Sequence, residues 1–507
     1  MTATLARLLG FPCPKQCKIL LIDDLHINRK NFSELYQYAA KHRIPLSVMK
    51  PPRDLLFVSG TWKNRAELLE PHVKILRNLP EEKLLDYHWD GIPLYDIYIH
   101  ELFSYLLAKP EWHDEALRKG NRAAVFHLVT ERNREDLLYN VSAAIWWLEW
   151  WKERMTFILE HSHAVIFSGS HIYQRAFIKS VEQKHVRTVL GETFFTGTNF
   201  YFEERLSPLP NSSFLGVRFA KVDQRFEPGD VELSLQQVAQ QQNLNVQQPA
   251  STDERLFAPG TKTIALIGQV SNDYSIICSK NKHLSTIGFY KELLGAILMQ
   301  TDYRVIVKTH PWEHKKTNLR RPLTLELLTD FLESFEDGKH ADRVKIVDSH
   351  NLYDIFQESE IVATLCSQAA LEAAYHGFKT AVFGSPFYGG LGFTTDYEDI
   401  EPFIRDLKAD PPLAGLLTLE EYDRYQQFIA YCIMHGLVGQ FNSRPMEDIL
   451  VRPYARGQAA MSVTEMGRRR MRNCVKQMGG AKIKRFMPKR LIQFAEYILH
   501  GKVITDK

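Results

Sequence analysis

The alternation of apolar runs with helical stretches is the feature that most constrains how this chain can fold. From residue 262 onward, runs rich in Ile, Val and Ala are typical of buried strands, and amphipathic stretches separate them. We expect strands at 262–270, 303–308, 343–347, 360–365 and 379–383, with helices at 286–300, 323–336, 351–357 and 367–376. Parallel strands need a long crossover, usually a helix, so this rhythm predicts a doubly wound α/β sheet.

A second region of the same kind precedes residue 224. Its expected strands lie at 18–24, 45–49, 163–170 and 186–192, and a long helix covers about 136–160. Between the two regions, residues 236–248 contain seven glutamines and few large apolar side chains, a composition that supplies no core. We therefore predict an N-terminal Rossmann-like domain over 1–224, a linker or excursion over 225–260, a second Rossmann-like domain over 261–440 and a helical basic tail over 441–507.

Length, charge and cysteine usage narrow the class of protein. A chain of 507 residues is too long for one ordinary core, which favours two domains. The net charge of +3 provides no field that would recruit nucleic acid, so we expect no nucleic-acid partner. The six cysteines are sparse, as in reduced cytoplasmic proteins, and neither a signal peptide nor a transmembrane segment stands out. We expect a cytoplasmic protein.

The basic tail is the segment whose composition suggests a membrane partner. Residues 465–507 hold twelve Lys or Arg against three acidic residues and mix this charge with Phe, Met, Leu and Ile. Such a mixture is typical of a helix that lies on an anionic membrane surface, here the inner face of the cytoplasmic membrane. The alternative is a solvated basic helix that packs back on the protein.

The long helix carries four tryptophans in pairs one turn apart, Trp146 with Trp150 and Trp147 with Trp151. Side chains at this spacing lie on the same face of a helix. We expect at least two of them to pack in the core. A platform on which a sugar stacks is the alternative.

The stretch "VIVKTHPWE", residues 305–313, places charged and polar residues at the end of a buried strand. Side chains alternate along a strand, so Lys308 and His310 leave the same face, and Pro311 ends the ladder. In an open α/β sheet, ligands bind outside the carboxyl ends of the strands. We therefore interpret these residues as part of a ligand site; an ordinary solvated strand end is the alternative.

Three further expected strands also end in polar side chains. The strand at 262–270 leads into Gln269, Asn272 and Asp273, the strand at 360–365 leads into Cys366, Ser367 and Gln368, and the strand at 186–192 ends in Glu192. Ser367 is expected to cap the next helix, whose free backbone N–H groups would receive a phosphate. The sequence contains neither a P-loop nor a Gly-rich fingerprint, which disfavours a kinase or a dinucleotide enzyme.

Metal ligands are not apparent in the sequence. No Asp-x-Asp motif follows a suitable strand, because Asp23 and Asp24 are adjacent. His161, His163 and His171 have no carboxylate or cysteine at ligand spacing, so we interpret them as strand and turn histidines. We expect neither a metal nor another cofactor.

Four stretches in a fixed order, "IGQVSNDYSI", "VIVKTHPWE", "ATLCSQAALEAAYHGFKTAVFG" and "PFYGGLGFT", make the chain recognisable. They resemble the bacterial capsule polysaccharide biosynthesis glycosyltransferases, a family that includes retaining β-Kdo transferases, which use CMP-Kdo. The Lys-x-His-Pro and serine-led helix motifs also look like the CMP-binding pair of bacterial sialyltransferases. The resemblance covers roughly residues 163–395. It implies a GT-B type fold, with two Rossmann-like domains facing a central cleft. The N-terminal domain, 1–224, would form the acceptor side, and the C-terminal domain, 261–440, would bind the CMP-sugar.

The resemblance also implies roles for residues of this chain. Lys308 and His310 would engage the CMP phosphate and the donor carboxylate, and Ser367 with its helix would bind the cytidylate. The full donor-binding set that we expect is Gln269, Asn272, Lys308, His310, Pro311, Ser367, Gln368, Tyr388 and Thr394. One departure is that Cys366-Ser367-Gln368 stands where the family usually has Asn-Ser-Ser or Asn-Ser-Thr.

Retention of the β linkage, which the resemblance implies, sets a requirement on the site. An even number of inversions at the anomeric carbon is needed, and double displacement through a carboxylate is the simplest route. Asp273 is the expected nucleophile, and Glu192 is the expected group that takes the acceptor's proton, although the two roles could be exchanged. The alternative is that Asp273 only caps the following turn.

The sequence thus predicts an enzyme that transfers Kdo from CMP-β-Kdo to a polysaccharide or glycolipid acceptor with retention. Its partners would be the CMP-sugar donor, the glycan acceptor and, through residues 465–507, an anionic membrane surface. One alternative is an inverting transferase of the CMP-sialic-acid type. Another is a non-catalytic glycan-binding or assembly subunit of a polysaccharide export system.

Overall fold

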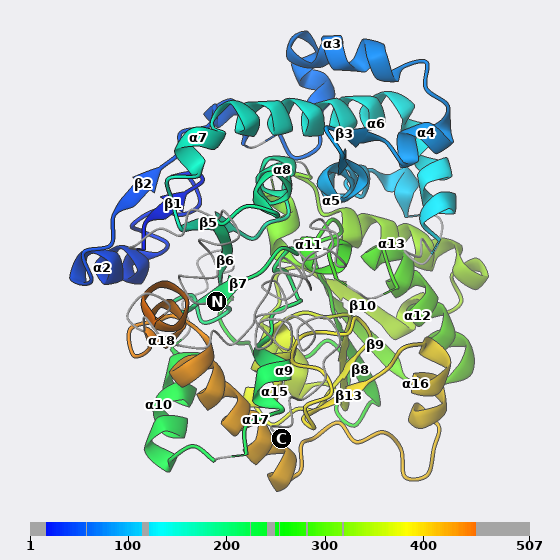
Figure 1. Ribbon diagram of the computed structural model, residues 1–507. Coiled ribbons are helices and arrows are strands. Elements are labelled where there is room, and N and C mark those ends of the chain that lie inside the picture. Colours follow the sequence, from blue (N-terminus) through cyan, green and yellow to red (C-terminus); the bar gives the residue numbers. More distant parts are fainter. Residues whose placement is uncertain are drawn as a thin grey trace, which may run out of the picture.

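Two separate β-sheets organise the protein (Figure 1). The computed structural model describes residues 17–452 except 57, 114–120, 224, 241–248, 253, 280–281 and 317–318. A short hairpin of β3 (His88–Trp89) and β4 (Ile92–Pro93) is the third sheet among the described residues. The α/β class predicted from the strand and helix rhythm is confirmed.

The first sheet has five strands in the order β2-β1-β5-β6-β7. They are β2 (Leu46–Val48), β1 (Ile19–Leu21), β5 (His163–Phe167), β6 (Arg187–Thr193) and β7 (Phe200–Glu204). The first four run parallel, and β7 is antiparallel to β6. Each central strand sends alternate side chains to two faces, because the period of a strand is two.

Each face of the first sheet has its own core. Leu20, Ala164 and Ile166 pack with α5 (Tyr95–Leu106), α6 (Arg122–Glu153) and α8 (Ile172–Val181). The opposite face, which includes Ile19 and Val165, packs against α2 (Ser33–Lys41). Helix α6 runs along the top of the view in Figure 1.

Helix α6 differs in its bounds from the predicted helix over 136–160. It begins at Arg122, because the Asn121 side chain accepts a hydrogen bond from the N–H of Ala124, and it has a kink at Asn133. Trp147 and Trp151 are wholly buried in the core, which confirms the expectation for at least two tryptophans. Trp150 is also buried.

The second sheet has six parallel strands in the order β10-β9-β8-β11-β12-β13. Their bounds are Val344–Val347, Arg304–Lys308, Thr263–Ile267, Ile361–Thr364, Thr380–Val382 and Thr394–Asp396, in the same order. Numbered from the first strand of this sheet, the order is 3-2-1-4-5-6, which is that of the Rossmann fold. Successive strands are added on one side of β8 up to β10 and on its other side from β11 onward, so the strand order reverses between β8 and β11. Ligands of such sheets bind at this switch point.

Helices cover both faces of the second sheet. Helices α12 (Thr286–Gln300), α13 (Leu323–Ser334) and α16 (Ile400–Leu407) pack on one face, and α14 (Leu352–Gln357) and α15 (Ala369–Tyr375) on the other. Every strand and helix predicted between residues 262 and 383 is present, and β13 is a further strand. The remaining helices are α3 (Ala66–Leu76), α4 (Glu81–Leu85), α7 (Met155–Ile158), α9 (Leu215–Phe219), α10 (Pro228–Ala239), α11 (Tyr274–Ile277), α17 (Leu419–Tyr431) and α18 (Arg444–Met446).

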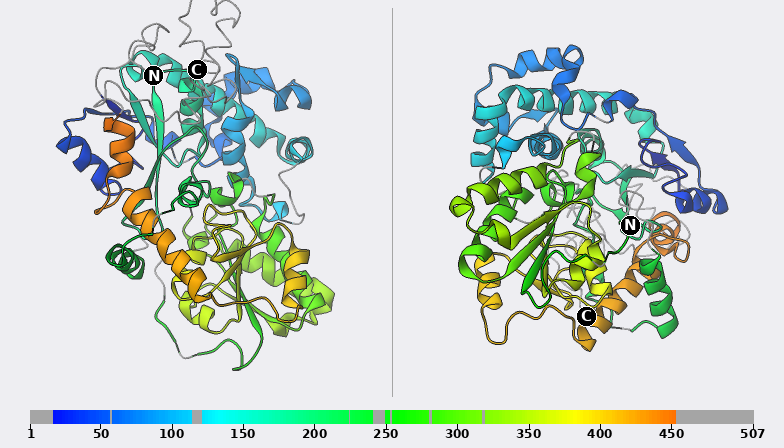
Figure 2. Two further views of the ribbon diagram at one scale, coloured as in Figure 1. Left: turned by 60° about the horizontal axis from the view of Figure 1, so that its bottom comes forward. Right: turned by 180° about the vertical axis from the view of Figure 1, so that it is seen from behind.

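The chain returns to the first sheet after the second sheet is complete. Helix α17 packs against α10, which lies at the start of the glutamine-rich segment. Val438 then pairs with Phe200 of β7, and Met446 and Leu450 are buried in the core beside α2. Figure 2 shows this path, with the orange helices running back toward the blue α2. The predicted domain boundaries stay a prediction, and the basic segment 465–507 lies outside the described residues.

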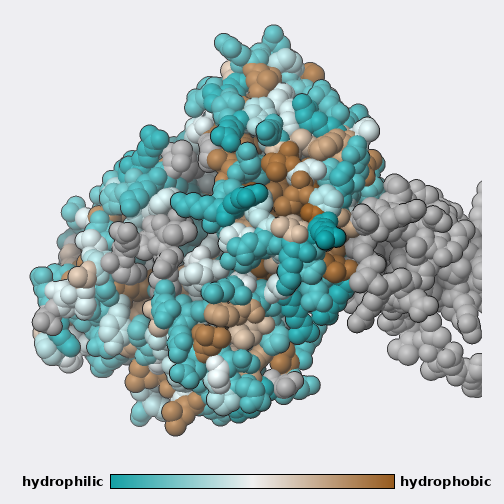
Figure 3. Space-filling view, turned by 90° about the vertical axis from the view of Figure 1, so that its left-hand side faces the viewer, coloured by the Kyte–Doolittle hydropathy of each residue, from teal (hydrophilic) through white to brown (hydrophobic). Residues whose placement is uncertain are grey.

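No helix in the described part of the chain is long and apolar enough to cross a membrane. The face drawn in Figure 3 is largely hydrophilic, with separate hydrophobic patches.

Candidate functional site

A pocket of about 610 Å³ lies at the carboxyl ends of strands from both sheets. The second sheet contributes the ends of β8, β9 and β11, and the first sheet contributes the ends of β5 and β6 and the segment after β1. Eight predicted site residues line it: Glu192, Gln269, Asp273, Lys308, His310, Pro311, Ser367 and Gln368. The structure therefore brings together residues that are far apart in the sequence.

Lys308 ends strand β9 with its ammonium group in the pocket wall. Its Nζ donates hydrogen bonds to the carbonyl oxygens of Asp348 (2.7 Å) and Thr309 (3.3 Å). Burial lowers the pKa of Lys308 to about 8, and Asp348 opposes this shift. An ammonium has three donors, so one remains for an anionic ligand.

His310 has a fixed tautomer. Its Nδ1 accepts a hydrogen bond from the N–H of Trp312 (3.2 Å), which caps the short helix Pro311–His314. Burial lowers the pKa of His310 to about 4, although Asp273 raises it. The imidazole is therefore neutral at pH 7, and because Nδ1 accepts, its proton is on Nε2.

Lys316 is a second cation of the pocket, beside Lys308, and the sequence interpretation did not include it. Its Nζ donates to the backbone carbonyl of Asn272 (2.9 Å), next to Asp273. Burial lowers the pKa of Lys316 to about 8, and Asp273 and Glu313 oppose this shift. Its position in "PWEHKK", after the strand end, was the available signal.

Asp273 both lines the pocket and caps a helix. Its Oδ1 accepts a hydrogen bond from the N–H of Ser275 (2.8 Å) at the start of α11, as the capping alternative predicted. Its Oδ2 lies 3.5 Å from Nε2 of Gln269, and Oε1 of Gln269 accepts from the N–H of Cys366 (3.0 Å). Gln269 thus ties the ends of β8 and β11 together and orients Asp273 at the switch point.

The predicted proximity of Asp273 and His310 follows from the pairing of β8 with β9. The two strands run parallel, with Ile267 opposite Lys308. Gly268 allows the two strand ends to approach closely, since a Cβ there would lie 2.8 Å from the carbonyl oxygen of Lys308. Asp273 is also among the charges that shift the pKa of His310.

Glu192 enters the pocket from β6 of the first sheet, across from Asp273. Burial and then the charge of Asp273 raise the pKa of Glu192 to about 8, and Arg205 opposes the shift. At neutral pH Glu192 is therefore mostly protonated, whereas an ordinary glutamate is charged. A raised pKa of this kind is typical of acid and base groups in active sites.

Ser367 lines the pocket, but the expectation that it is the N-cap is wrong by one residue. Gln368 occupies the N-cap position of α15 and makes no capping bond with its side chain. Ser367 Oγ instead accepts a hydrogen bond from the N–H of Ala369 (3.2 Å). The amide oxygen of Gln368 has no hydrogen-bond partner within the described residues, although it is buried.

Three predicted donor-binding residues do not line the pocket. Asn272 is wholly buried, and its amide donates to the carbonyl of Ser104 (2.8 Å). Tyr388 donates its hydroxyl to the carbonyl of Ser367, and Thr394 donates to Asp396 Oδ2 (2.9 Å). Each of these three side chains donates a hydrogen bond to a protein oxygen and does not line the pocket. Their positions in the sequence do not reveal these contacts.

The first sheet contributes polar residues that the sequence interpretation missed. His26 and Asn31 follow β1, Ser168 ends β5, and Asn211 lies in a loop after β7. His171, interpreted as a turn histidine, also lines the pocket. The signal for His26 was available, because "LIDDLH" ends a strand in polar residues just as "VIVKTH" does.

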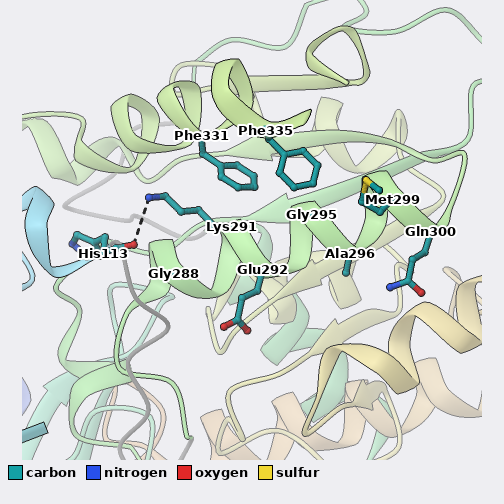
Figure 4. A pocket seen from close by; sticks show the side chains of 10 residues that line it. All are labelled: His113, Gly288, Lys291, Glu292, Gly295, Ala296, Met299, Gln300, Phe331 and Phe335. Carbon is teal, nitrogen blue, oxygen red and sulfur yellow. Dashed lines mark hydrogen bonds between the residues drawn. The ribbon is translucent and has the colours of Figure 1, made fainter. Parts of the chain in front are cut away.

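A second cavity of about 580 Å³ lies on the outer face of α12, away from the strand ends. Figure 4 shows Phe331 and Phe335 beside Gly295 of α12, with Lys291 donating to the His113 carbonyl (3.4 Å). It contains none of the predicted site residues. Within the described residues, no group of three or more His, Cys, Asp or Glu is placed to hold a metal ion.

Two Rossmann-like sheets with a polar pocket at their facing strand ends define a protein of the GT-B type. Residues 222–421 match a family model described as "Capsule polysaccharide biosynthesis protein". This range includes the whole second sheet and the residues it places in the pocket. The match confirms the resemblance drawn from the sequence: residues 222–421 of the chain are similar to the capsule polysaccharide biosynthesis family.

A comparison with solved structures found matches of low identity and low TM-score. KpsC of Thermosulfurimonas dismutans, described as a beta Kdo 2,4 transferase, is 17% identical, with 53% of this chain and 79% of that chain covered and a TM-score of 0.37. The beta Kdo 2,7 transferase of the same KpsC is 18% identical, with 52% and 75% covered and a TM-score of 0.32. A UDP-GlcNAc 2-epimerase of Methanocaldococcus jannaschii is 9% identical, with 82% and 99% covered and a TM-score of 0.28. A comparison with curated proteins found no match. At such scores these likenesses assign no function to the chain.

Proposed function

We propose that the protein is a glycosyltransferase that moves Kdo from CMP-β-Kdo to a glycan acceptor with retention of the β linkage. The observation that carries this proposal is the composition of the pocket at the switch point. Asp273 lies there beside Lys308, His310 and Lys316, and Glu192 faces it from the other sheet. The family match and the motif resemblance support the same function.

Lys308, His310 and Lys316 would bind a donor that has two anionic groups, a phosphate and a carboxylate. Burial holds the pKa values of Lys308 and Lys316 below their ordinary range, so the site contains positive charge that is incompletely compensated. An anionic donor would supply the missing charge. The neutral His310 would donate from Nε2, and the unpartnered amide oxygen of Gln368 suits the amino group of cytosine.

Double displacement would give retention with Asp273 as the nucleophile and Glu192 as the base. In the first step, a carboxylate oxygen of Asp273 forms a bond to the anomeric carbon, and CMP leaves with the electron pair of the broken bond. In the second step, the acceptor hydroxyl attacks the same carbon and displaces Asp273, while Glu192 takes the hydroxyl proton. No metal or other cofactor takes part in either step of this proposal.

The coupling between the two carboxyl groups would time the second step. The charge of Asp273 is one cause of the raised pKa of Glu192. An ester on Asp273 carries no charge, so its formation would lower the pKa of Glu192. Glu192 would then lose its proton once the intermediate exists and become a base when the acceptor needs one.

Release of CMP from CMP-Kdo in the presence of acceptor tests the enzymatic function. A β-linked product supports retention, and an α-linked product would favour the inverting alternative. Absence of CMP release, together with intact glycan binding, would favour the non-catalytic alternative. A cytoplasmic location with contact between residues 465–507 and the inner face of the cytoplasmic membrane remains part of the proposal.

A further inference from the structure

The pocket wall from the first sheet carries two histidines, each close to a buried carboxylate. His26 and His171 both line the pocket. The wholly buried Asp23 places Oδ1 3.2 Å from Nδ1 of His26. Glu101 of α5, also buried, places Oε2 3.5 Å from Nδ1 of His171. The proposed donor chemistry uses neither pair.

The contacts of Asp23 determine which nitrogen of His26 carries the proton. Although burial raises it, the hydrogen bonds and charge of His26 hold the pKa of Asp23 below its ordinary value. The carboxylate only accepts, so Nδ1 of His26 carries a proton and donates it to Asp23. Tyr173 donates its hydroxyl to Oδ2 (3.0 Å), and the N–H of His26 donates to Oδ1 (2.8 Å). Asp23 therefore fixes both the tautomer and the position of the ring.

A row of rings connects His26 with the centre of the pocket. His26 stacks on Phe167 with centroids 5.0 Å apart and lies 6.3 Å from His171 in a stacked arrangement. His171 meets Tyr274 edge-on at 5.2 Å. Tyr274 directly follows Asp273 in the chain, so this wall borders the proposed nucleophile.

Charge is distributed unequally between the two sides of the pocket. Among the described residues that line it, the two lysines, Lys308 and Lys316, come from the end of β9 and the segment after it. The first-sheet side has histidine, amide and hydroxyl groups and the carboxyl group of Glu192, but no lysine or arginine among the described lining residues. Anionic donor groups therefore match the second sheet. Neutral donors and acceptors beside flat rings match sugar hydroxyls and the apolar face of a sugar ring.

We propose that His26, oriented by Asp23, binds a hydroxyl group of the acceptor sugar, which lies against His171 and Phe167. This inference rests on the proposed function and locates its acceptor subsite on the first sheet. His26 would touch the acceptor, and Asp23 would act through His26 as a positioning residue. The sugar hydroxyl would form a hydrogen bond with Nε2 of His26, since Nδ1 is held by Asp23.

The test compares His26→Gln and Asp23→Asn with the exposed-site control His88→Gln. Methyl glycosides of common neutral sugars serve as acceptor probes, and the one with the fastest transfer is used for kinetics. Loss of one hydrogen bond of about 1.4 kcal/mol corresponds to about a tenfold rise in the acceptor KM. We expect this rise in both variants, a smaller change in kcat and unchanged CMP affinity. The control should behave as wild type.

Acceptor KM values equal to wild type in His26→Gln and Asp23→Asn would overturn the inference. Because Asp23 is buried, thermal unfolding of each variant is measured, and His26→Asn provides a second substitution that leaves Asp23 in place. If the wild-type protein released no CMP from CMP-Kdo under any condition, this result would contradict the proposed function itself, and with it the acceptor subsite that rests on it. An intact donor reaction with an unchanged acceptor KM would instead contradict the acceptor subsite alone.

Discussion

Replacing Lys308 by Met should weaken CMP binding without unfolding the protein. Met keeps the apolar stem of the side chain and removes the ammonium group. The ammonium has one donor left after its bonds to Asp348 and Thr309. A hydrogen bond to a charged group contributes about 1.5–3 kcal/mol, so we expect the Kd for CMP to rise about 10- to 150-fold. Isothermal titration calorimetry measures this change, and the exposed Lys315→Met is the matched control.

The pH dependence of binding gives a second measure of the same residue. The pKa of Lys308 in the free protein is about 8, and a bound anion would raise it. CMP affinity should therefore be full below that pKa and should fall as the pH rises through it. In Lys308→Met the fall should be shallower, since Lys316 alone retains a pKa of about 8.

Stability should respond to pH with the opposite sign. The pKa of Lys308 is lower in the folded state than its ordinary value of 10.5, so the unfolded chain binds more protons between about pH 8 and 10.5. This residue therefore makes stability rise with pH in that window, and Lys308→Met should lack this contribution. Wild-type CMP affinity in Lys308→Met, with an unchanged pH profile, would refute the donor-site reasoning.

Three other predictions address different parts of the account. Glu192→Gln should lower turnover about 100-fold or more, as loss of a general base does, while CMP affinity persists; normal turnover would exclude Glu192 as the base. Asn272→Ala should lower stability by about 1–3 kcal/mol in chemical unfolding, because the Ser104 carbonyl loses a buried donor. Binding to liposomes should require anionic lipid, fade with added salt and depend on residues 465–507; salt-independent binding would contradict the electrostatic contact.

The sequence predicted the second sheet well because its pattern is local. Strands such as Val305–Val307 are runs of buried β-branched residues, and each is followed by a helix of ordinary length. Alternation along the strand and the rule for strand ends were enough to locate Lys308, His310, Gln269 and Asp273 at one site. These residues are within a few positions of a recognisable strand end.

Other features depend on contacts that local patterns do not encode. Tyr388 and Thr394 follow a loop whose path decides whether they face the pocket, and the structure turns their hydroxyls to Ser367 and Asp396. Lys316 reaches the pocket only because the chain folds back after Pro311–His314. The return of Val438 to pair with Phe200 joins segments more than two hundred residues apart, which no local pattern predicts.

The role of His171 shows how burial changes the interpretation of a residue. In the sequence, its spacing from other potential ligands gave no reason to expect a metal. The contacts of His171 with Glu101 from α5 and with Tyr274 from α11 place it in the pocket wall. Both neighbours are distant in the sequence, so only the fold reveals that His171 lines the pocket.

The covalent intermediate on Asp273 is the central claim, and intact-protein mass spectrometry tests it most directly. Glu192→Gln is incubated with CMP-Kdo in the absence of acceptor, followed by peptide mapping, with Asp273→Asn in the same background as the control. The account predicts a mass increase of one Kdo residue on the peptide that contains Asp273, and no increase in the control. An Asp273→Ala enzyme that turns over normally, or an adduct on another residue, would contradict it.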